Sequence, residues 1–224
     1  MTKFNKILRK KTEKLLIKEF ISLFKGLLVK KEKNKRFSFA IPGGRSPVNL
    51  LRSLSKEKIN WKKIDLFWVD ERYVSRNSNY LNFNLAKKYL INKIEINKEN
   101  IFNINTNKKS SYESAKDYKK RLRLYFKAKR FCFDLILLGV GSDGHIASIF
   151  PNKKDLKNKD SVFTVLRDDF ERISLNLKTI NASKKIVLWL NNKSKSLNYL
   201  KIKNRNNVPV NKINKKKTNL FMIK

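Results

Sequence analysis

A hydrophobic strand that runs directly into a glycine-rich turn lies within residues 133–151, which read FDLILLGVGSDGHIASIFP. Its first part, Phe133 to Leu138, is an apolar run of strand length. The turn holds three of the six glycines of the chain, and His145, the only histidine, follows at once. Because α/β proteins present their chemistry at the carboxyl ends of strands, this segment predicts an α/β fold with a site at His145.

The rest of the chain alternates between strand and helix patterns. Apolar runs predict strands at 36–41, 64–69, 101–104, 185–190 and 219–223, and helical spacing predicts helices at 3–33, 48–54, 82–91, 112–129 and 193–201. Polar alternation at 162–166 and 172–177 predicts a hairpin, and the Lys/Asn-rich stretch 201–217 predicts a long surface loop. This order favours an α/β fold with a largely parallel sheet, and the absence of a linker composition predicts a single domain over residues 1–224.

The composition argues against several classes of protein. The chain has 224 residues, and its 41% apolar content can build a substantial core. No stretch approaches the roughly 20 apolar residues of a membrane helix, and the first residues lack the pattern of a secretory signal, so we expect a cytoplasmic protein without a membrane partner. One cysteine and one histidine without ligand spacing predict no disulfide, no metal site and no cofactor.

The formal charge of +36 comes mainly from lysine, which supplies 42 of the 54 basic residues. The aromatic residues lie in apolar runs such as FSFAI and IVLWL, and they do not alternate with lysine as a base-stacking surface would require. We therefore expect no specific nucleic-acid partner and attribute the excess to compositional drift and a solvated surface. A positive field of this size still attracts anionic substrates.

Two further strand ends carry polar groups. Residues 42–47 (PGGRSP) lead from a strand into a helix, with Ser46 expected as the N-cap and Pro47 as the first helical residue. Backbone N–H groups at such a turn bind phosphate well, although a plain capped turn has the same pattern. Asp70-Glu71-Arg72 ends the next strand, where Arg72 could clamp an anion and Asp70 could hold a hydroxyl or a proton; a solvated loop is the alternative.

In a parallel sheet, these strand ends and the turn before His145 would meet at one edge. A histidine there can take a proton from water, and Asp143 could orient the imidazole or hold a substrate hydroxyl. A histidine that only stabilises its loop is the alternative. The segment lacks the G-x-S-x-G nucleophile elbow, and no G-x-G-x-x-G opens a helix, which argues against a serine nucleophile and a dinucleotide.

The motifs PGGRSP, VDERYV and FDLILLGVGSDGHIASIFP resemble the 6-phosphogluconolactonase family, which belongs to a larger group with glucosamine-6-phosphate isomerase/deaminase. The later segment ERISLNLKTINASKKIVLWL resembles the family too. The resemblance implies a Rossmann-like three-layer domain with a smaller appended element. It also implies hydrolysis of 6-phosphoglucono-1,5-lactone to 6-phosphogluconate in the oxidative pentose phosphate pathway, without a metal, by a monomer or weak homodimer.

Roles for individual residues follow from the resemblance. His145 matches the general base that activates water, and Asp143 matches the acid of the DGH motif. Contacts with substrate are implied for Gly43, Gly44, Arg45, Ser46, Asp70, Arg72, Asn82, Arg172 and Lys195. Within this set, the phosphate is expected on Gly43 to Ser46, Arg72 and Lys195. The sequence departs from the family pattern at Ser75, Leu81 and Asn192, where proline, serine and glycine are usual, and none of these changes removes a catalytic group.

Two alternative functions remain. The isomerase/deaminase branch carries an acidic residue just before the proline that ends the motif, where this chain has Phe150. Shuttling protons between sugar carbons needs that carboxylate, whereas lactone hydrolysis needs only activated water and a stabilised oxyanion. A non-catalytic sugar-phosphate or nucleic-acid binding protein would be expected to lose the histidine or Arg72, and both are present.

Overall fold

A seven-stranded parallel sheet forms the centre of the computed structural model, which describes residues 3–32, 34–128 and 130–224. Every neighbouring pair of its strands is parallel. In spatial order the strands are β1 (Lys6–Lys10), β10 (Thr218–Ile223), β9 (Lys185–Leu190), β6 (Leu135–Gly139), β2 (Phe37–Ile41), β3 (Ile64–Trp68) and β5 (Ile101–Phe102). The predicted α/β fold with a largely parallel sheet is confirmed.

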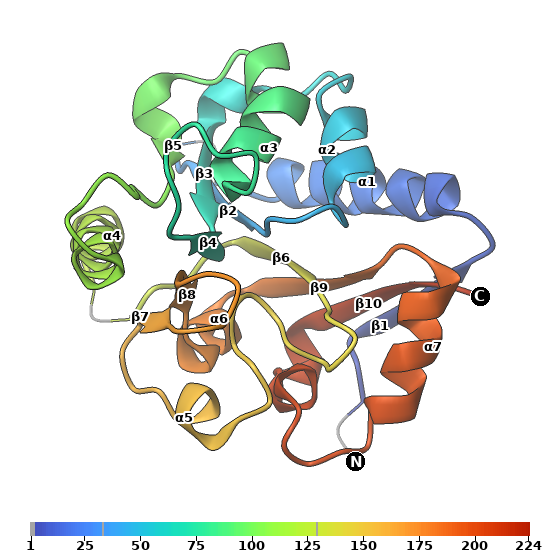
Figure 1. Cartoon of the computed structure of the whole chain (residues 1–224). Coiled ribbons are helices and arrows are strands. Elements are labelled where there is room, and N and C mark those ends of the chain that lie inside the picture. The colour runs from blue at the N-terminus through green and yellow to red at the C-terminus, as the bar shows by residue number, and fades with distance from the viewer. Residues whose placement is uncertain (1–2, 33, 129) are drawn as a thin grey trace.

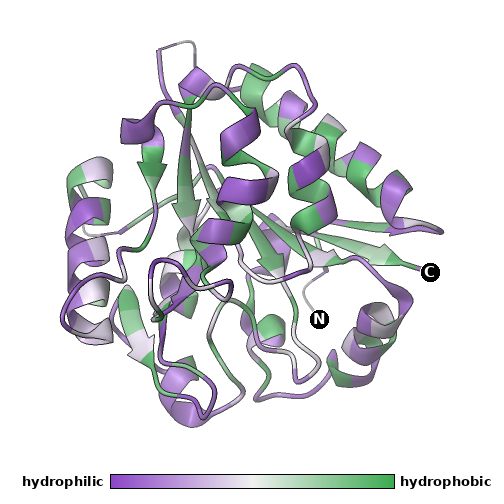
Figure 2. Cartoon of the chain, turned by 45° about the horizontal axis from the view of Figure 1, so that its top comes forward, coloured by the Kyte–Doolittle hydropathy of each residue, from purple (hydrophilic) through white to green (hydrophobic). Residues whose placement is uncertain are grey.

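Helices cover both faces of this sheet and make a three-layer structure (Figure 1). One face carries α1 (Glu13–Val29), α2 (Val48–Leu54) and α3 (Asn82–Tyr89), and the other carries α4 (Ser111–Phe126), α6 (Leu177–Ala182) and α7 (Lys193–Ile202). The strands are hydrophobic along most of their length, while the helices alternate between hydrophobic and hydrophilic residues (Figure 2). This contrast is expected for strands buried on both faces under amphipathic helices.

The longest helix, α1, shows how the apolar stripes are used. Its buried residues Leu16, Phe20 and Phe24 face the sheet, and the Phe20 ring lies 6.0 Å from Trp189 and 6.1 Å from Phe221. Full burial of a side chain of this size contributes about 1.5–3 kcal/mol. The helix therefore ties β9 and β10 into the core.

A second sheet of three antiparallel strands, β4 (Asp70–Arg72), β8 (Arg172–Leu175) and β7 (Val162–Val165), lies beside the first. The predicted hairpin is its β7–β8 pair. Its apolar residues belong to the same hydrophobic core as the large sheet. This small sheet, with α5 (Lys153–Leu156), is the smaller element that was expected. Short 3₁₀ helices lie in the connections at Trp61–Lys63, Ile91–Lys93, Lys98–Asn100, Pro209–Lys212 and Lys215–Lys217.

The helix predicted over 3–33 is wrong at its start, because Lys6–Lys10 form strand β1. β1 pairs with β10 near the other end of the sequence, and Thr12 then caps α1 by accepting a hydrogen bond from the Leu15 N–H (3.3 Å). Residue 33 at the predicted end lies outside the described residues, as does residue 129 at the end of the helix predicted over 112–129. Pairing between distant segments overrode the local helical pattern here.

Two other expectations need correction. The strand predicted over 172–177 ends at Leu175, because Asn176 caps α6 by accepting a hydrogen bond from the Thr179 N–H at 2.8 Å. The stretch 201–217 is not a loose surface loop: Val208 and Val210 are buried, and the Val210 N–H donates to the Gly144 carbonyl at 3.2 Å. The valines therefore support the turn that precedes His145.

β2 and β6 are parallel neighbours in the sheet, but the connections that leave them lead to opposite sides of the pair. The chain continues from β2 to β3 on one side, and from β6 to β9 on the other. The loops that leave the two strands therefore diverge and open a crevice, which is where open α/β sheets bind ligands. Among the described residues, no helix is both long and apolar enough to cross a membrane.

Candidate active site

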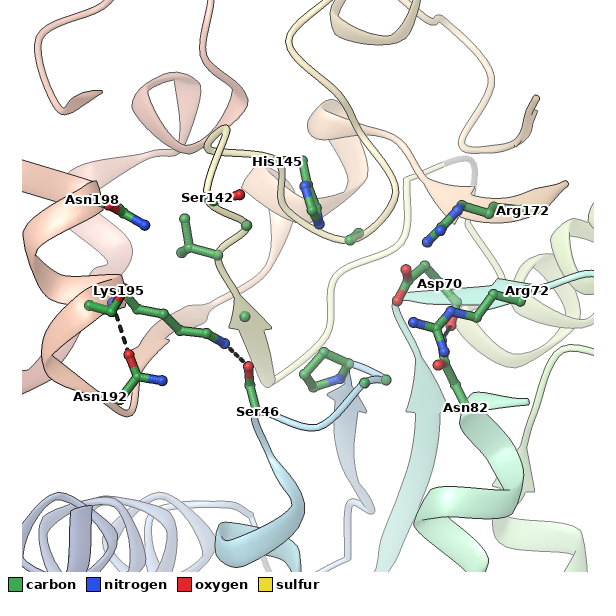
Figure 3. Close-up of a pocket in the computed structure, with 18 residues that line it drawn as sticks. Ser46, Asp70, Arg72, Asn82, Ser142, His145, Arg172, Asn192, Lys195 and Asn198 are labelled. Carbon is green, nitrogen blue, oxygen red and sulfur yellow. Dashed lines mark hydrogen bonds between the residues drawn. The ribbon is translucent and has the colours of Figure 1, made fainter. Parts of the chain in front are cut away.

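A cavity of about 430 Å³ opens at the carboxyl ends of β2 and β6 and beside β4 (Figure 3). Most of the residues predicted for the site line it: Gly43, Gly44, Ser46, Asp70, Arg72, Asn82, His145, Arg172 and Lys195. Arg45 is exposed and does not line the cavity, so the contact implied for it stays a prediction without support from its position. Asp143 does not line the cavity either, but it contacts His145.

The His145 ring is held by Asp143. Nδ1 of His145 lies 2.6 Å from Oδ1 of Asp143, and the backbone N–H of His145 donates to the same oxygen at 3.1 Å. Burial acts to raise the pKa of Asp143, but its hydrogen bonds with His145 outweigh that effect and lower the pKa below its ordinary value. An ionised carboxylate only accepts, so Nδ1 carries the hydrogen and Nε2 of the neutral ring is left with a lone pair.

Two glycines permit this geometry. A Cβ atom on Gly141 would lie 2.1 Å from Nδ1 of His145. Gly144 has φ +86°, and a Cβ there would lie 2.0 Å from Cγ1 of Val208. The turn thus needs glycine for the close approach of the imidazole at one position and for a left-handed backbone at the other.

The ring of Phe150 packs against the ring of His145. Its ring centroid lies 4.8 Å from that of His145, with the planes at 40°. The guanidinium carbon of Arg167 lies 4.4 Å from the same Phe150 ring, and that of Arg172 lies 5.7 Å away. Phe150 is therefore a buried spacer between the imidazole and two cationic groups, and no carboxylate occupies its position.

Lys195 reaches across the cavity from the first turn of α7 to the loop after β2. Its ammonium donates a hydrogen bond to the Ser46 hydroxyl (Figure 3). The expectation that Ser46 caps α2 is wrong: Pro47 occupies the N-cap position, no side chain caps the helix, and the Ser46 hydroxyl faces the lysine instead. Burial lowers the pKa of Lys195. Gly43, Gly44, Ser46 and Lys195 thus form one cationic corner of the cavity, here called the lysine pole.

Asp70 and Glu71 have different roles although they are adjacent. Asp70 lines the cavity, and its Oδ2 accepts a hydrogen bond from the Ser148 hydroxyl at 2.7 Å. Glu71 is fully buried and points away: its oxygens accept from the backbone N–H groups of Arg72, Asn82 and Phe83 at 2.7–2.9 Å. Burial raises the pKa of Glu71 to about 8 against these hydrogen bonds. Glu71 therefore caps the start of α3, which has no cap from its own N-cap residue.

Asn82 is 2% exposed, and its Nδ2 donates to the Asp70 carbonyl at 3.1 Å. Its Oδ1 is buried without a hydrogen-bond partner among the described residues. A Cβ atom on Gly43 would lie 1.8 Å from Cγ of Asn82, so glycine is needed there to admit the amide. A buried acceptor that lines a cavity and has no partner is suited to a hydroxyl of a bound ligand.

Arg72 and Arg172 face the cavity from β4 and β8, where they are direct partners across the strand pair. Arg72 Nη1 donates to the Tyr80 carbonyl at 2.9 Å, and Arg172 Nη2 lies 2.5 Å from Oδ2 of Asp169. The Arg172 side chain is 12% exposed, and its Nε has no partner among the described residues. These two residues are here called the arginine pole.

Some lining residues were not predicted, namely Pro42, Gly139, Val140, Gly141, Ser142, Ala147, Asn192, Ser194 and Asn198. Ser194 and Asn198 lie one turn apart on α7 beside Lys195, and that spacing could have indicated them. Ala147 has φ +49°, which nothing in its sequence context signals. Within residues 3–32, 34–128 and 130–224, no three His, Cys, Asp or Glu side chains gather as a metal site would require.

Comparison with curated proteins finds relatives that are named 6-phosphogluconolactonase or probable 6-phosphogluconolactonase. A "6-phosphogluconolactonase" of Nostoc sp. is 34% identical over 156 residues, which are 68% of this chain and 65% of the relative. A "probable 6-phosphogluconolactonase 1" of Arabidopsis thaliana is 36% identical over 62% of this chain and 56% of the relative. The chain thus matches less than two thirds of the length of these two relatives.

Solved structures agree on the fold. The crystal structure of 6-phosphogluconolactonase from Thermotoga maritima has a TM-score of 0.85 at 22% identity and covers 99% of both chains. The enzyme from Trypanosoma cruzi has a TM-score of 0.85 at 23% identity, over 100% of this chain and 96% of the other. The family model described as glucosamine-6-phosphate isomerases/6-phosphogluconolactonase matches residues 11–222. The chain therefore belongs to the glucosamine-6-phosphate isomerase/6-phosphogluconolactonase family.

Proposed function

We propose that this protein hydrolyses 6-phosphoglucono-1,5-lactone to 6-phosphogluconate, the lactonase step of the oxidative pentose phosphate pathway. The observation that carries the proposal is the hydrogen-bonded Asp143–His145 pair, whose ring is directed into a cavity with cationic groups on two sides (Figure 3). The names of the curated relatives support the same activity. The expected cytoplasmic location and the expected monomer or weak homodimer stay predictions.

His145 acts as the general base. Nε2 takes a proton from water as the water oxygen attacks the lactone carbonyl carbon, and a tetrahedral oxyanion forms. When the ring C–O bond breaks, the imidazolium returns this proton to the leaving ring oxygen, which becomes a hydroxyl. The product is the open-chain acid, and His145 is neutral again. Asp143 stabilises the transient imidazolium and keeps the hydrogen on Nδ1, as its 2.6 Å contact allows.

The lysine pole binds the phosphate. Lys195 supplies a partly buried ammonium, and Ser46 supplies a hydroxyl that contacts it. Gly43 and Gly44 add backbone N–H groups on the loop that enters α2, an arrangement that suits a dianion. The hydroxyls of the sugar ring then lie between the poles, within reach of Asn82 and Asp70.

Phe150 separates this activity from that of the isomerases in the family. An isomerase needs a carboxylate at this position to move protons between sugar carbons. Here the position holds a ring that is 7% exposed and packed on His145. A buried apolar ring cannot exchange a proton, so the site is equipped for hydrolysis only.

The direct test is acid release from freshly prepared 6-phosphogluconolactone, followed by a pH indicator or by coupling to 6-phosphogluconate dehydrogenase. The purified full chain should increase the rate well above spontaneous hydrolysis, in proportion to its concentration. Gluconolactone without phosphate should be a much poorer substrate, because it cannot use the lysine pole. A rate equal to the spontaneous one would refute the proposed activity.

A further inference from the structure

We propose that a second cavity, at the end of the sheet opposite to the active site, binds a small amphiphilic anion with the chemistry of a medium-chain fatty acid. The inference goes beyond the proposed function and does not depend on it. The second cavity has a volume of about 480 Å³, within the range of roughly 300–1,000 Å³ that is typical of small-molecule sites. It lies at Phe37, the first residue of β2, whereas the active site opens at the carboxyl end of the same strand.

Three segments of the chain give the second cavity an apolar floor. The last turn of α1 contributes Leu28 and Val29, β2 contributes Phe37, and the loop before the 3₁₀ helix Trp61–Lys63 contributes Ile59. Phe37 is buried, and Leu28 and Ile59 are half-buried and packed against the core. Val29 is 85% exposed. An apolar chain bound on this floor would remove the Val29 side chain from water, which is favourable.

Five lysines surround the apolar floor, and two of them lack an acidic partner. The five are Lys25, Lys31, Lys35, Lys58 and Lys63. The first three form ion pairs, with Glu57 at 2.6 Å, Asp134 at 2.6 Å and Glu32 at 2.8 Å, respectively. Lys58 and Lys63 form no ion pair within residues 3–32, 34–128 and 130–224. Two positive charges are therefore left unbalanced, which suits a ligand with an anionic head group.

The acceptors around the second cavity are largely used by the protein itself. The Leu28 carbonyl accepts a hydrogen bond from the Lys31 N–H at 3.2 Å, and the Ile59 carbonyl accepts one from the Trp61 N–H at 3.0 Å. Glu32 supplies the only carboxylate among the described lining residues, and it is paired with a lysine. A cationic head group would thus find ammonium groups and few acceptors, so the second cavity discriminates between anions and cations.

The character of the floor favours one amphiphilic molecule over a nucleic acid. Single-stranded nucleic acids bind on basic surfaces whose exposed aromatic rings stack on the bases. The only aromatic residue that lines the second cavity in the described part of the chain is Phe37, which is 3% exposed and already packs edge-on against Phe24 at 5.7 Å. Its ring offers no face for a base, whereas Leu28, Val29 and Ile59 offer aliphatic surface to a hydrocarbon chain.

Octanoate and 1-octanol test the inference, because they have the same chain length and differ in charge. An NMR titration of the ¹⁵N-labelled full chain gives both Kd values and locates the ligand. The amide signals of Leu28, Val29 and Ile59 should shift with saturable, one-site behaviour. Octanoate should bind roughly 2- to 30-fold more tightly than octanol, the effect of two exposed ion pairs. Octyltrimethylammonium, which carries the opposite charge on the same chain, should bind more weakly than octanol.

Three variants separate the head group from the chain. The double variant Lys58→Ala, Lys63→Ala should bring the ratio of the two Kd values close to one and leave the Kd of octanol nearly unchanged. Val29→Ser should weaken both ligands by a similar factor and keep the ratio. The matched control Lys62→Ala, Lys93→Ala also removes two exposed lysines, but neither lines the second cavity, so both Kd values should stay as in the wild type. All five side chains are exposed, so the variants are expected to fold.

Several outcomes would overturn the inference. One is an absence of saturable octanoate binding, and another is a wild-type ratio near one. A loss of the ratio in the Lys62→Ala, Lys93→Ala control would assign the effect to general surface charge. Binding of anionic phospholipid vesicles without binding of octanoate would assign this face to a membrane surface.

The active-site cavity is cationic too, so the location of octanoate needs its own control. Saturating 6-phosphogluconate should leave the Kd of octanoate unchanged, and displacement of octanoate would show that it binds in the active site and overturn the inference. Because no catalysis is measured, a chain that binds octanoate without lactonase activity refutes only the proposed function. An active lactonase that does not bind octanoate refutes only the assignment of the second cavity.

Discussion

Asp134, which is buried at the amino end of β6, has a full set of partners, whereas two buried polar groups that line the cavity at the other edge of the sheet have partners missing. Asp134, just before β6, accepts hydrogen bonds from Lys31 at 2.6 Å, from Lys184 at 2.9 Å and from both the N–H and the hydroxyl of Ser38. In the cavity, Asn82 Oδ1 at the start of α3 and Arg172 Nε at the start of β8 are buried without partners in the described chain.

The difference separates structural from functional use of charge. A buried group with every partner in place adds specificity to the fold and is costly to disturb. A buried group whose partner is missing lowers stability until a ligand supplies that partner. Loss of Asp134 should therefore reduce stability and preserve activity, while changes in the residues that line the cavity should reduce activity and preserve stability.

His145→Ala should have the largest effect, because it removes the proposed base. We expect kcat to fall by about 10²- to 10⁴-fold, the usual contribution of a general base. The thermal midpoint should change little, since the side chain is 34% exposed and its main polar contact is Asp143. Steady-state kinetics and a thermal melt on the same sample measure both quantities. Activity near that of the wild type would mean that another group activates the water.

Asp134→Ala should have the opposite profile. Removing the carboxylate leaves the Lys31 ammonium, whose side chain is 16% exposed, without its partner, and such a loss costs about 3–5 kcal/mol of unfolding free energy. The kcat of the folded fraction should be unchanged. Urea unfolding at neutral pH gives the free energy, and Asp160→Ala, which breaks an ion pair with a 67% exposed carboxylate, is the control with an expected cost below about 1 kcal/mol.

The loss of stability at low pH gives a second measurement of the contacts between Asp134 and its partners Lys31, Ser38 and Lys184. Burial acts to raise the pKa of Asp134, but its bonds with Lys31, Ser38 and Lys184 outweigh it and lower the pKa below the ordinary 3.8. With a lowered pKa in the fold, the stabilisation is complete above the ordinary value and is lost as the pH falls through the folded value. Wild-type stability should thus decrease more steeply below about pH 4 than that of Asp134→Asn; parallel curves would contradict the assignment.

Asp143→Asn should have a smaller effect than loss of the histidine. The amide can present its NH₂ group to Nδ1, which favours the tautomer with hydrogen on Nε2 and removes the lone pair that faces water. We expect kcat to fall roughly 10- to 100-fold at nearly constant KM, because the base remains but is wrongly protonated. An unchanged kcat with a raised KM would show instead that Asp143 binds the sugar.

Half of the residues that line the cavity could be predicted from the sequence, because several of them follow the ends of strands. Gly43, Arg72 and His145 each follow an apolar run, and parallel strands bring their carboxyl ends to one edge. Gly43, Gly44 and Ser46 of the loop after β2 line the cavity as expected, but other expectations for this loop were wrong. Ser46 was expected to cap α2 and contacts Lys195, and Arg45 lies off the cavity, because side-chain directions in a turn depend on contacts that are distant in sequence.

The parts that could not be predicted depend on such distant contacts. Lys6–Lys10 has no strand signal of its own and is extended because β10 lies beside it. Val208 and Val210 lie in a Lys/Asn-rich stretch that suggests a solvated loop, yet they pack under Gly144. The middle residue of the DER motif, Glu71, is indistinguishable by sequence from a site residue, and only its three backbone donors identify it as a helix cap.

The pairing of β1 with β10 also determines how early the sheet can be completed during synthesis of the chain (Figure 1). Lys6 lies beside Asn219, so β1 cannot pair until β10, Thr218–Ile223, has been synthesised. At about 5–20 residues per second, that delay is roughly 10 to 40 s. During this interval the segment Lys6–Lys10 has no partner strand from its own chain, and the positive charges of Lys6, Arg9 and Lys10 are well suited to discourage pairing with the strands of other chains.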